Sequence, residues 1–389
     1  MESKSAFPDD PASRALLDAV GDLAPRIAAS AAAIERDRRL PEALVTAMVD
    51  AGLFRMTVPR SLGGGEVPLG TLSRVIEAVA KADASTAWCV SQNAGVCELA
   101  AFLPREGARE IFGPRTTAAG GHGPATAERV PGGYRLTGQW AYGSGVRHAT
   151  WLRANCEFVD SSGPGVAGQG PEHGILFIPA AEATISDVWQ VSGLRGTGSD
   201  TYAVKDLFVP AERAVRADSQ EPGTLYVFGP NQVFSIGFAS VALGVARASL
   251  DALIDLAATK TPRGITGFLR DQPMVQAEVA RAEASLRSAR AFLHQTVEEA
   301  WLCAAATRLL PLGQRAMIRL ATTYAIQQAA GVADVAYHNA GGTAIFADAP
   351  FERRFRDMHA VTQQVQARSD HFEYVGQFLF GMRPESQWL

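Results

Sequence analysis

The sequence predicts a mostly α-helical protein with a small β domain in the middle of the chain. Apolar residues recur at three- and four-residue spacing over about 11–113 and again over about 230–389, which is typical of helices that bury one face. Between about 115 and 215, glycine and proline become frequent and short apolar runs alternate with turn signals, which is typical of strands. We therefore expect an N-terminal helical domain over 1–114, a β-barrel or sandwich over 115–222 and a C-terminal four-helix bundle over 223–389.

The N-terminal zone contains four predicted helices. The first is amphipathic, and its apolar positions are Leu16, Val20, Leu23, Ile27 and Ala31. Pro25 falls inside this pattern and predicts a kink or a break, because proline removes an internal hydrogen bond. Pro41 is placed to begin a second, short helix that ends near Gly52. Two more helices are expected over 71–81 and 84–103, and the latter is apolar on nearly every side, as a buried helix is.

The β zone is predicted from four strand-like runs separated by turns. These runs are Tyr134–Thr137, Trp151–Val159, Gly174–Pro179 and Thr201–Val209. A glycine-rich linker, Ser161–Pro171, lies between the second and third runs and is expected to be an exposed loop. Short strands with turn signals between them favour a barrel or a sandwich.

The C-terminal zone contains four long helical segments. They are predicted over 231–258, 273–306, 314–339 and 352–375, with Gly- and Pro-containing breakers between them. Residues 222–246 carry no charge, but glycines, prolines and amides interrupt the start of this stretch. Its continuous apolar part is too short to cross a bilayer, so we interpret it as a buried core helix.

Composition excludes several classes of function. The chain has 389 residues, 47% hydrophobic and 20% charged, as a globular protein does. Its 36 Lys and Arg against 40 Asp and Glu give a net charge of −4, so no basic excess exists to bind nucleic acid or an anionic membrane. The four cysteines form no CxxC pair, which predicts neither a disulfide framework nor a metal site. The first ten residues are acidic and polar, which argues against a secretory signal. We therefore expect a cytoplasmic protein.

Nucleotide-binding units of the common kinds are not indicated. No P-loop of the form GxxxxGK[ST] occurs, and no strand, glycine-rich turn and helix follow one another as in a dinucleotide-binding unit. A redox cofactor, if the protein uses one, is therefore not expected on a Rossmann fold.

Three segments resemble the acyl-CoA dehydrogenase superfamily, and the likeness covers nearly the whole chain. The clearest is Trp189–Asp200, which contains the family's W-x-x-x-G-L-R-G-T-G-S block and is followed by the strand Val204–Pro210. The others are Gly133–Trp140 with Gly143-Ser-Gly145 and Trp151, and Gly341-Gly342 with Phe351–Asp357. The resemblance implies the same three-zone fold that the periodicity predicts.

The family contains dehydrogenases and oxygenases, and two features favour the oxygenases. Many dehydrogenases carry a glutamate base after the Arg-Asp pair, but the matching position here is Val365, which cannot accept a proton. The stretch Trp140–His148, with Trp151, resembles the W-x-F-x-S-G-x-x-H-x-x-W pattern of two-component flavin monooxygenases. These enzymes take reduced flavin, FADH2 or FMNH2, from a separate flavin reductase, and the lack of a nicotinamide-binding unit here agrees with that arrangement.

The resemblance implies a set of flavin-binding residues. Ser144 matches a serine at flavin N5 that supports the C4a-hydroperoxide, although Gly-Ser-Gly alone is ordinary turn chemistry. Trp140 matches a flavin-wall tryptophan, or it fills the β-domain core. The remaining implied cofactor residues are Leu194, Arg195, Gly196, Thr197, Gly198, Ser199, Arg263, Arg270, Gln276, Gly341 and Gly342. Of these, Arg263, Arg270 and Gln276 are expected to reach the flavin of a neighbouring subunit, and a homotetramer is implied.

The implied catalytic and substrate residues depart from the phenol-hydroxylating relatives. Gln364 stands where those relatives tend to have a histidine base, and Cys97 stands where several have histidine. Either the small-molecule substrate needs no base, or His122 serves instead. The pocket is expected to be lined by Trp88, Gln92, Asn93, Cys97 and Gly121.

The sequence therefore predicts an oxygenase that uses reduced flavin and O2 to hydroxylate an aromatic substrate (phenolic, indolic or polycyclic) or to oxidise a heteroatom. Two alternatives stay open at this stage. One is an acyl-CoA dehydrogenase-like flavoprotein that passes electrons to an electron-transfer flavoprotein. The other is a non-catalytic binding protein that keeps the fold.

Overall fold

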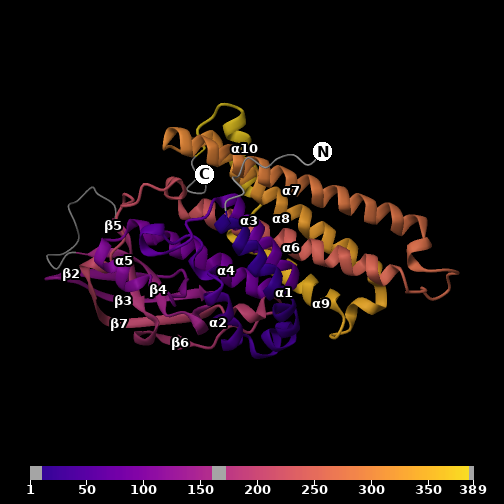
Figure 1. Cartoon of the computed structure of the whole chain (residues 1–389), viewed down its shortest axis with the longest axis horizontal. Helices are drawn as coiled ribbons and strands as arrows, with labels where there is room; N and C mark the ends of the chain where they lie inside the picture. Colours follow the sequence, from indigo (N-terminus) through magenta and orange to yellow (C-terminus); the bar gives the residue numbers. More distant parts are fainter. Residues whose placement is uncertain (1–10, 160–171, 385–389) are drawn as a thin grey trace.

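The computed structural model describes residues 11–159 and 172–384, and it contains the three predicted zones in the predicted order. Figure 1 shows the β domain at one end, the long C-terminal helices extending away from it, and the N-terminal helices packed where the two meet. The predicted loop at Ser161–Pro171 lies outside the described residues. A G-x-G-x-x-G spacing does occur in this linker, at 163–168, but the strands on either side of it pair antiparallel, which is not the dinucleotide-binding arrangement.

Among the residues that the structure describes, the N-terminal zone contains five α-helices. They are α1 (Pro11–Asp37), α2 (Glu42–Asp50), α3 (Leu69–Ala82), α4 (Ala84–Cys97) and α5 (Arg105–Ile111). Of the kink or break predicted at Pro25, the break is wrong, because α1 continues through this residue. Pro25 lies on the exposed side of α1 while Val20, Ile27 and Ile34 are buried, so packing holds the helix together where proline removes one bond.

The β domain is a curled seven-stranded mixed sheet. Its strands are β1 (Ala118–Gly120), β2 (Ala125–Val130), β3 (Gly133–Gly143), β4 (Trp151–Val159), β5 (Glu172–Pro179), β6 (Thr184–Ser186) and β7 (Asp200–Pro210). The strand order is β1-β4-β2-β3-β7-β6, and β5 pairs with β4. Side chains alternate along β4, so Leu152 and Ala154 enter the β-domain core while Arg153 points away from it, toward the helices.

Up to residue 384, where the described part of the chain ends, the C-terminal zone contains five α-helices. They are α6 (Pro230–Ala257), α7 (Pro273–Thr307), α8 (Leu312–Ala340), α9 (Pro350–Thr362) and α10 (Asp370–Leu379). The single helix predicted over 352–375 is therefore wrong at its centre, where the chain leaves helical geometry. Gln364 adopts an extended conformation there, and its side-chain Oε1 accepts a hydrogen bond from the Gln366 N–H at 2.6 Å. This local cap supplies the backbone partner that a continuous helix would have supplied.

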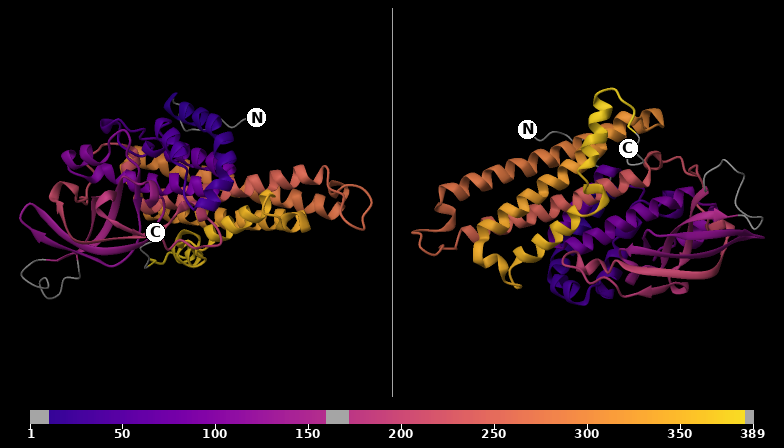
Figure 2. Two further views of the ribbon diagram at one scale, coloured as in Figure 1. Left: turned by 90° about the horizontal axis from the view of Figure 1, so that it is seen from below. Right: turned by 180° about the vertical axis from the view of Figure 1, so that it is seen from behind.

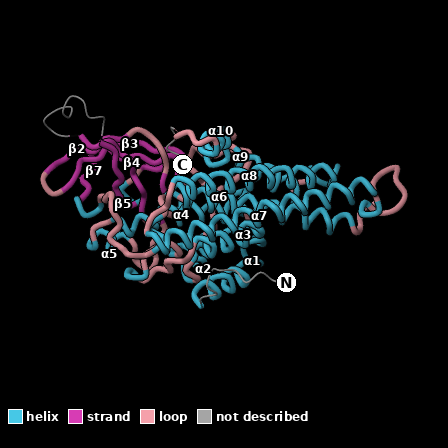
Figure 3. The backbone as a smooth tube through the Cα atoms, turned by 90° about the horizontal axis from the view of Figure 1, so that it is seen from above, coloured by secondary structure: helices cyan, strands magenta, loops and turns pink. Residues whose placement is uncertain are grey.

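One hydrophobic core joins the N-terminal and C-terminal helices, and α6 runs through its centre. Helix α6 is long and apolar enough to cross a membrane, but 89% of its most apolar window is buried inside the protein, so it is a core helix. Figures 2 and 3 show the sheet at one end of the molecule and the loop between α6 and α7 at the other end. The predicted flavin-binding residues around Ser144 lie where the sheet meets α4 and α6.

Candidate functional site

A chain of hydrogen-bonded hydroxyl groups lies at the end of β3, against α4. Trp88 on α4 donates its indole N–H to Ser144 Oγ at 3.1 Å. Ser144 Oγ lies 2.7 Å from Ser199 Oγ, and Ser199 Oγ lies 2.7 Å from Thr197 Oγ1. Thr197 Oγ1 donates to the Leu194 carbonyl at 2.8 Å. Each of these hydroxyls is buried, so the chain brings Ser144 and the predicted glycine-rich loop into one site.

The direction of this chain follows from its two ends. The indole of Trp88 is only a donor and the Leu194 carbonyl is only an acceptor, while each hydroxyl carries one proton. Thr197 uses its proton on the carbonyl, so Ser199 donates to Thr197 and Ser144 donates to Ser199. Ser144 therefore accepts one bond and donates one, and its oxygen keeps one lone pair for a ligand.

The glycine-rich loop is shaped by contacts with α9 and the N-terminal helices. Leu194 has a positive φ of 52°, a costly conformation for a bulky residue. Its N–H donates to Oδ1 of Asp357 at 2.6 Å. Gly193 lies so close to α9 that a Cβ would be 2.1 Å from the Arg356 carbonyl oxygen. At Gly196 a Cβ would lie 2.0 Å from the Ile34 side chain, so both glycines are required by packing.

Asp357 is a buried carboxyl group whose pKa lies above its ordinary value. Burial, followed by the neighbouring Asp83, raises the pKa of Asp357 to about 7. Its oxygen fixes the Leu194 N–H, so this residue positions the loop that carries Thr197 and Ser199.

A row of aromatic rings runs from Ser144 along α6. The Trp88 ring, whose N–H contacts Ser144, stacks on Phe238 with centroids 4.0 Å apart and an angle of 15°. Phe238 is followed by Phe234, with centroids 5.9 Å apart and an angle of 14°. At Gly95 of α4 a Cβ would lie 2.3 Å from the Phe234 ring, so glycine lets this ring lie flat against the helix. The guanidinium carbon of Arg153 lies 5.9 Å from the Phe234 ring centroid, at the other end of the row.

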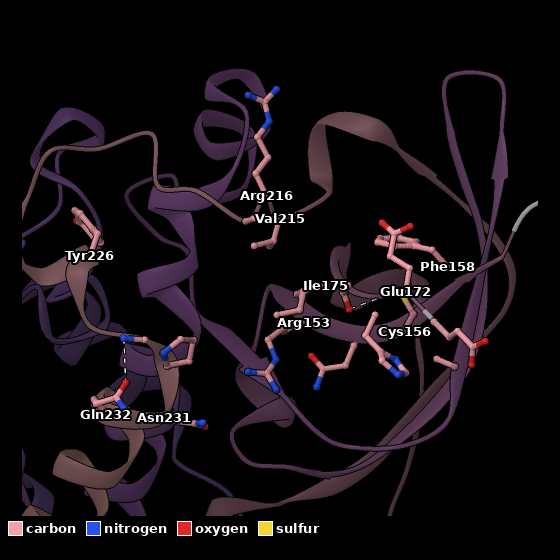
Figure 4. Close-up of a pocket in the computed structure, with 18 of the residues that line it drawn as sticks. Arg153, Cys156, Phe158, Glu172, Ile175, Val215, Arg216, Tyr226, Asn231 and Gln232 are labelled. Carbon is pink, nitrogen blue, oxygen red and sulfur yellow. Dashed lines mark hydrogen bonds between the residues drawn. The ribbon is translucent and has the colours of Figure 1, made fainter. Parts of the chain in front are cut away.

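A cleft of about 1350 Å³ opens where β2, β4 and β5 face the start of α6 and the turn between α7 and α8. Figure 4 shows Arg153 projecting from its strand into this cleft. The lining contains the arginines Arg153, Arg216, Arg308 and Arg315 and the glutamates Glu157 and Glu172. Glu172 is already paired with Arg129 at 2.6 Å. The cleft therefore has a positive bias, and Arg153 is its buried member, with 6% of its surface exposed.

His122 lies on the loop that borders this cleft. Its backbone forms a two-bond bridge with Ala141, each bond 2.9 Å long. Desolvation by the surrounding protein, and second the positive charge of Arg153, lower the pKa of His122 below its ordinary value. The His122 imidazole is therefore neutral near pH 7 and is able to accept a proton.

Several predicted pocket residues hold the fold instead of lining the cleft. Asn93 donates to the Phe54 carbonyl at 2.8 Å and accepts from the Ala118 N–H at 2.8 Å, so both ends of its amide are engaged. Cys97 is buried beside Phe54, and burial raises the pKa of its thiol to about 12. We therefore leave Asn93 and Cys97 out of the proposed pocket.

Three other predicted residues lie near the site with distinct roles. Trp140 has no exposed surface, stacks on Tyr202 and donates to the Asn155 carbonyl at 2.9 Å, so in this structure it belongs to the sheet core. Gln92 donates to the Gly120 carbonyl at 3.1 Å and is partly buried beside the aromatic row. Gly121 donates its N–H to the Tyr202 hydroxyl, which fixes the loop before His122.

Two more predicted residues have partners within the protein. The Gln364 side-chain oxygen caps the backbone between α9 and α10. Its side-chain nitrogen makes no hydrogen bond to the described residues. Arg195 donates to the Val191 carbonyl at 3.0 Å and lies 3.4 Å from Glu35, so it anchors the glycine-rich loop to α1. Gly198, with a φ of 49°, lies against Arg147 and Arg38 at the end of that loop.

The residues predicted to bind flavin phosphates lie at the opposite end of the molecule. Arg263, Arg270 and Gln276 are exposed in and after the loop between α6 and α7, where the Gln276 amide donates to the Arg270 carbonyl at 2.9 Å. Gly341 and Gly342 follow α8 near Lys260, also away from the sheet (Figure 2). One chain therefore does not bring these residues to Ser144.

Sequence reasoning missed Arg153, Phe234, Phe238 and Asp357. A signal for Arg153 existed, because a charged residue inside the strand-like run Trp151–Val159 must either reach solvent or find a special environment. No such signal marks the two phenylalanines, which belong to an apolar helix like any other. Among the described residues, no group of three metal-ligating side chains is found.

Comparisons with known proteins agree with this fold. The acyl-CoA dehydrogenase N-terminal domain matches residues 10–112, and the acyl-CoA dehydrogenase C-terminal domain matches residues 236–368. Indole-3-acetate monooxygenase of Pseudomonas putida is 34% identical, over 99% of this chain and 97% of that protein. The HsaA oxygenase subunit of a flavin-dependent monooxygenase from Mycobacterium tuberculosis is 30% identical, over 95% and 96%.

A solved structure extends the likeness to three dimensions. XiaF from Streptomyces sp., in complex with FADH2 and glycerol, superposes with a TM-score of 0.88 at 27% identity. The superposition covers 97% of this chain and 98% of XiaF. The likeness therefore extends over all three zones of the chain.

Proposed function

We propose an aromatic hydroxylation for this chain, from the premise that it belongs to the acyl-CoA dehydrogenase family and is the oxygenase component of a two-component monooxygenase that depends on reduced flavin. One oxygen atom of O2 enters the substrate and the other leaves as water, with both electrons drawn from the reduced flavin. The flavin reductase of the system supplies that flavin. The substrate is an aromatic ring, and oxidation of a heteroatom on such a compound is the second candidate.

The observation that carries this proposal is the hydroxyl chain at Ser144. Reduced flavin differs from oxidised flavin in carrying a hydrogen on N5, so it offers a donor where oxidised flavin offers an acceptor. The Ser144 hydroxyl uses its one O–H in the hydrogen bond to Ser199, so toward a ligand it is able only to accept a hydrogen bond. The residues therefore fit the reduced form, and Ser144 would accept the N5–H without disturbing its other partners.

The surroundings of Ser144 would also keep the reaction dry. Trp88, which donates a hydrogen bond to Ser144, is buried and stacks on the buried ring of Phe238. Excluding water strengthens hydrogen bonds inside a site and prevents oxidising equivalents from being lost to solvent. Bound reduced flavin supplies the electrons and activates O2, while the protein supplies the acceptor, the aromatic wall and the closed environment.

Proton transfer in the proposed reaction falls to His122 where the substrate requires a base. Its imidazole is neutral near pH 7 and its chain neighbour Gly123 lines the cleft, whereas Gln364 has no basic group and caps a turn. An electron-rich ring such as an indole needs no base, so the dependence on His122 would report the substrate's chemistry. Activity that falls in His122→Asn by more than tenfold at pH 7 would indicate a phenolic substrate.

We further infer a homotetramer in the cytoplasm. Arg263, Arg270 and Gln276 lie far from Ser144 within one chain, so they reach the same flavin only when a second copy supplies them. The four free cysteines agree with a reducing compartment. Light scattering of the purified protein tests the assembly, and a monomer that binds flavin at full affinity would contradict it.

The experiment that tests the function is an anaerobic titration with oxidised and reduced flavin. We expect tighter binding of the reduced form, rapid reoxidation when O2 is added, and no bleaching of the oxidised flavin by an acyl-CoA thioester. Bleaching by the thioester without O2 would instead support a dehydrogenase. Absence of affinity for either flavin form would support a binding protein without redox activity.

A further inference from the structure

Arg153 is a buried cation without a partner inside the described protein. Only 6% of its surface is exposed, its Nε makes no hydrogen bond, and no carboxylate lies within ion-pair distance of it in the described residues. Its main-chain carbonyl accepts a hydrogen bond from Tyr202, whereas its guanidinium contacts the Phe234 ring and has no hydrogen-bond or ion-pair partner among the described residues. Burial lowers the pKa of Arg153, as expected for a charge that has lost water and gained no counter-ion.

An unpaired buried arginine is costly for folding, so its retention needs a reason. Buried charges in proteins are nearly always paired or hydrogen-bonded. Replacing Arg153 with an apolar residue of similar length would remove this cost. The side chain is held in place by packing, since Gly120 lies so close that a Cβ there would be 3.2 Å from Arg153 Nε. A fixed, dehydrated cation that lines a cleft is a preformed site for an anion.

The cleft around Arg153 suits an anionic ligand in its charge. Arg216, Arg308 and Arg315 line it too, and one of its two glutamates is neutralised by Arg129. Guanidinium groups bind carboxylates through two parallel hydrogen bonds in one plane. Asn155 and Asn231 belong to the same lining, so amide groups accompany the arginines there.

The aromatic row connects this cation to the proposed oxygenation site. Phe234 lies under the guanidinium and Phe238 follows it, and Phe238 stacks on Trp88, which contacts Ser144. A flat ring placed against this row would have its anionic end at Arg153 and its opposite end toward Ser144. The two polar ends, Arg153 and Ser144, are thus separated by a row of three aromatic rings, Phe234, Phe238 and Trp88.

We propose that Arg153 binds a carboxylate of the substrate, and that the substrates of this enzyme are aromatic acids rather than neutral phenols. This inference rests on the proposed function, because it assigns a substrate class to the same site. Arg153 fixes the orientation of the acid, so that the ring and not the carboxylate faces Ser144.

The first test is binding to the ligand-free protein, which needs neither flavin nor turnover. Indole-3-acetate and its uncharged amide, indole-3-acetamide, differ by one charge at nearly constant shape. Calorimetry should show the acid binding at least about 30-fold more tightly than the amide, because charge-paired hydrogen bonds in closed sites are strong. Equal binding of the two, or no binding of the acid, would overturn the proposal.

The second test compares arginine variants in the same assay. Arg153→Met should abolish the preference for the acid, and Arg153→Lys should keep part of it, because lysine retains the charge but not the planar fork. Arg135→Met is the matched control, since Arg135 is an arginine of β3 outside the cleft lining whose loss changes the net charge equally. It should leave the acid preference unchanged.

The flavin measurement separates this proposal from the function it rests on. Reduced-flavin affinity of Arg153→Met should equal that of the wild type, while its KM for the acid rises about 30-fold or more. A matching loss of flavin affinity would show that Arg153 binds the flavin phosphate, which overturns the substrate assignment. A wild-type protein that binds the acid but fails to oxygenate anything with reduced flavin would contradict the proposed function and leave the acid site standing.

Discussion

Two arginines of the β domain, Arg147 and Arg153, respond to burial in opposite ways. Arg147 Nε lies 2.5 Å from Oδ2 of Asp200, whose side chain is 1% exposed, and its Nη2 lies 3.0 Å from Asp187. Arg153 is more deeply buried and has no such partner. The paired arginine holds the structure together, because Asp200 also accepts the N–H groups of Val188 and Trp189. The unpaired Arg153 indicates a ligand site. The presence or absence of a buried carboxylate partner therefore distinguishes a structural arginine from a functional one.

Replacing Arg147 with methionine should give the largest loss of stability. The change leaves the Asp200 carboxylate buried without its cation, which costs about 3 to 5 kcal/mol of unfolding free energy. Urea unfolding followed by circular dichroism measures this quantity. A loss below about 1 kcal/mol would remove the contrast between the two arginines, since the pair would then be dispensable.

Asp357 shows a third response to burial, which is to take up a proton. Its pKa is raised to about 7 in the folded protein, against an ordinary value of 3.8, so the folded state holds a proton that the unfolded state releases. This contribution to stability is therefore lost as the pH rises from about 4 to about 7, by at most roughly 4 kcal/mol. Asp357→Asn should flatten the pH dependence in this window, in urea titrations at a series of pH values. An unaltered slope would show that Asp357 is ionised throughout.

Ser144 extends the contrast from charges to hydroxyl groups. Its bonds to Trp88 and Ser199 satisfy its proton, and its remaining lone pair is free for a ligand. Ser144→Ala should lower the preference for reduced over oxidised flavin about fivefold, the equivalent of one hydrogen bond. Ser249→Ala is the control, because that buried serine bonds only the Val245 carbonyl of its own helix. Anaerobic titration gives both affinities, and a preference equal to that of the control would refute the role of Ser144.

Ser199→Ala should have a smaller effect by a different route. Without Ser199 the proton of Ser144 is free to point at oxidised flavin N5, so binding of the oxidised form improves. The preference for reduced flavin should fall about threefold, through the oxidised affinity alone. A fall that comes from weaker binding of the reduced form would contradict the assigned direction of the hydroxyl chain.

The smallest expected change is in the stability of Arg153→Met. Removing an unpaired buried cation should leave the unfolding free energy within about 1 kcal/mol of the wild type, or raise it. The unfolding free energies of Arg153→Met and Arg147→Met are to be compared in the same urea series. A loss as large as that of Arg147→Met would show that Arg153 also has a structural partner.

The architecture could be predicted from the sequence because periodicity reports which face of an element is buried. Helices α1, α6, α7 and α8 and strands β3, β4, β5 and β7 all follow such patterns. The break between α9 and α10 could not be predicted, because no glycine or proline marks it and the Gln364 side chain caps the Gln366 N–H only once the chain has left the helix. Tertiary packing likewise overrode Pro25 in α1.

The candidate site was only partly predictable for a similar reason. Ser144 and the loop 194–199 are contiguous motifs, and the structure brings them together through Ser199 and Thr197. Asn93 and Cys97 lie on the same helix as Trp88, but their partners come from residues far away in sequence. Arg153 became distinctive only through the absence of a partner among the described residues, which is a property of the folded state.

The central claim is that this protein transfers oxygen from O2 to an aromatic acid with electrons from reduced flavin. The most direct test supplies reduced flavin through a reductase under isotopically labelled O2 and weighs the product formed from indole-3-acetate. We predict one labelled oxygen atom per product molecule, and no product when the flavin is kept oxidised. A product without the label, or electron transfer from an acyl-CoA thioester in the absence of O2, would contradict the account.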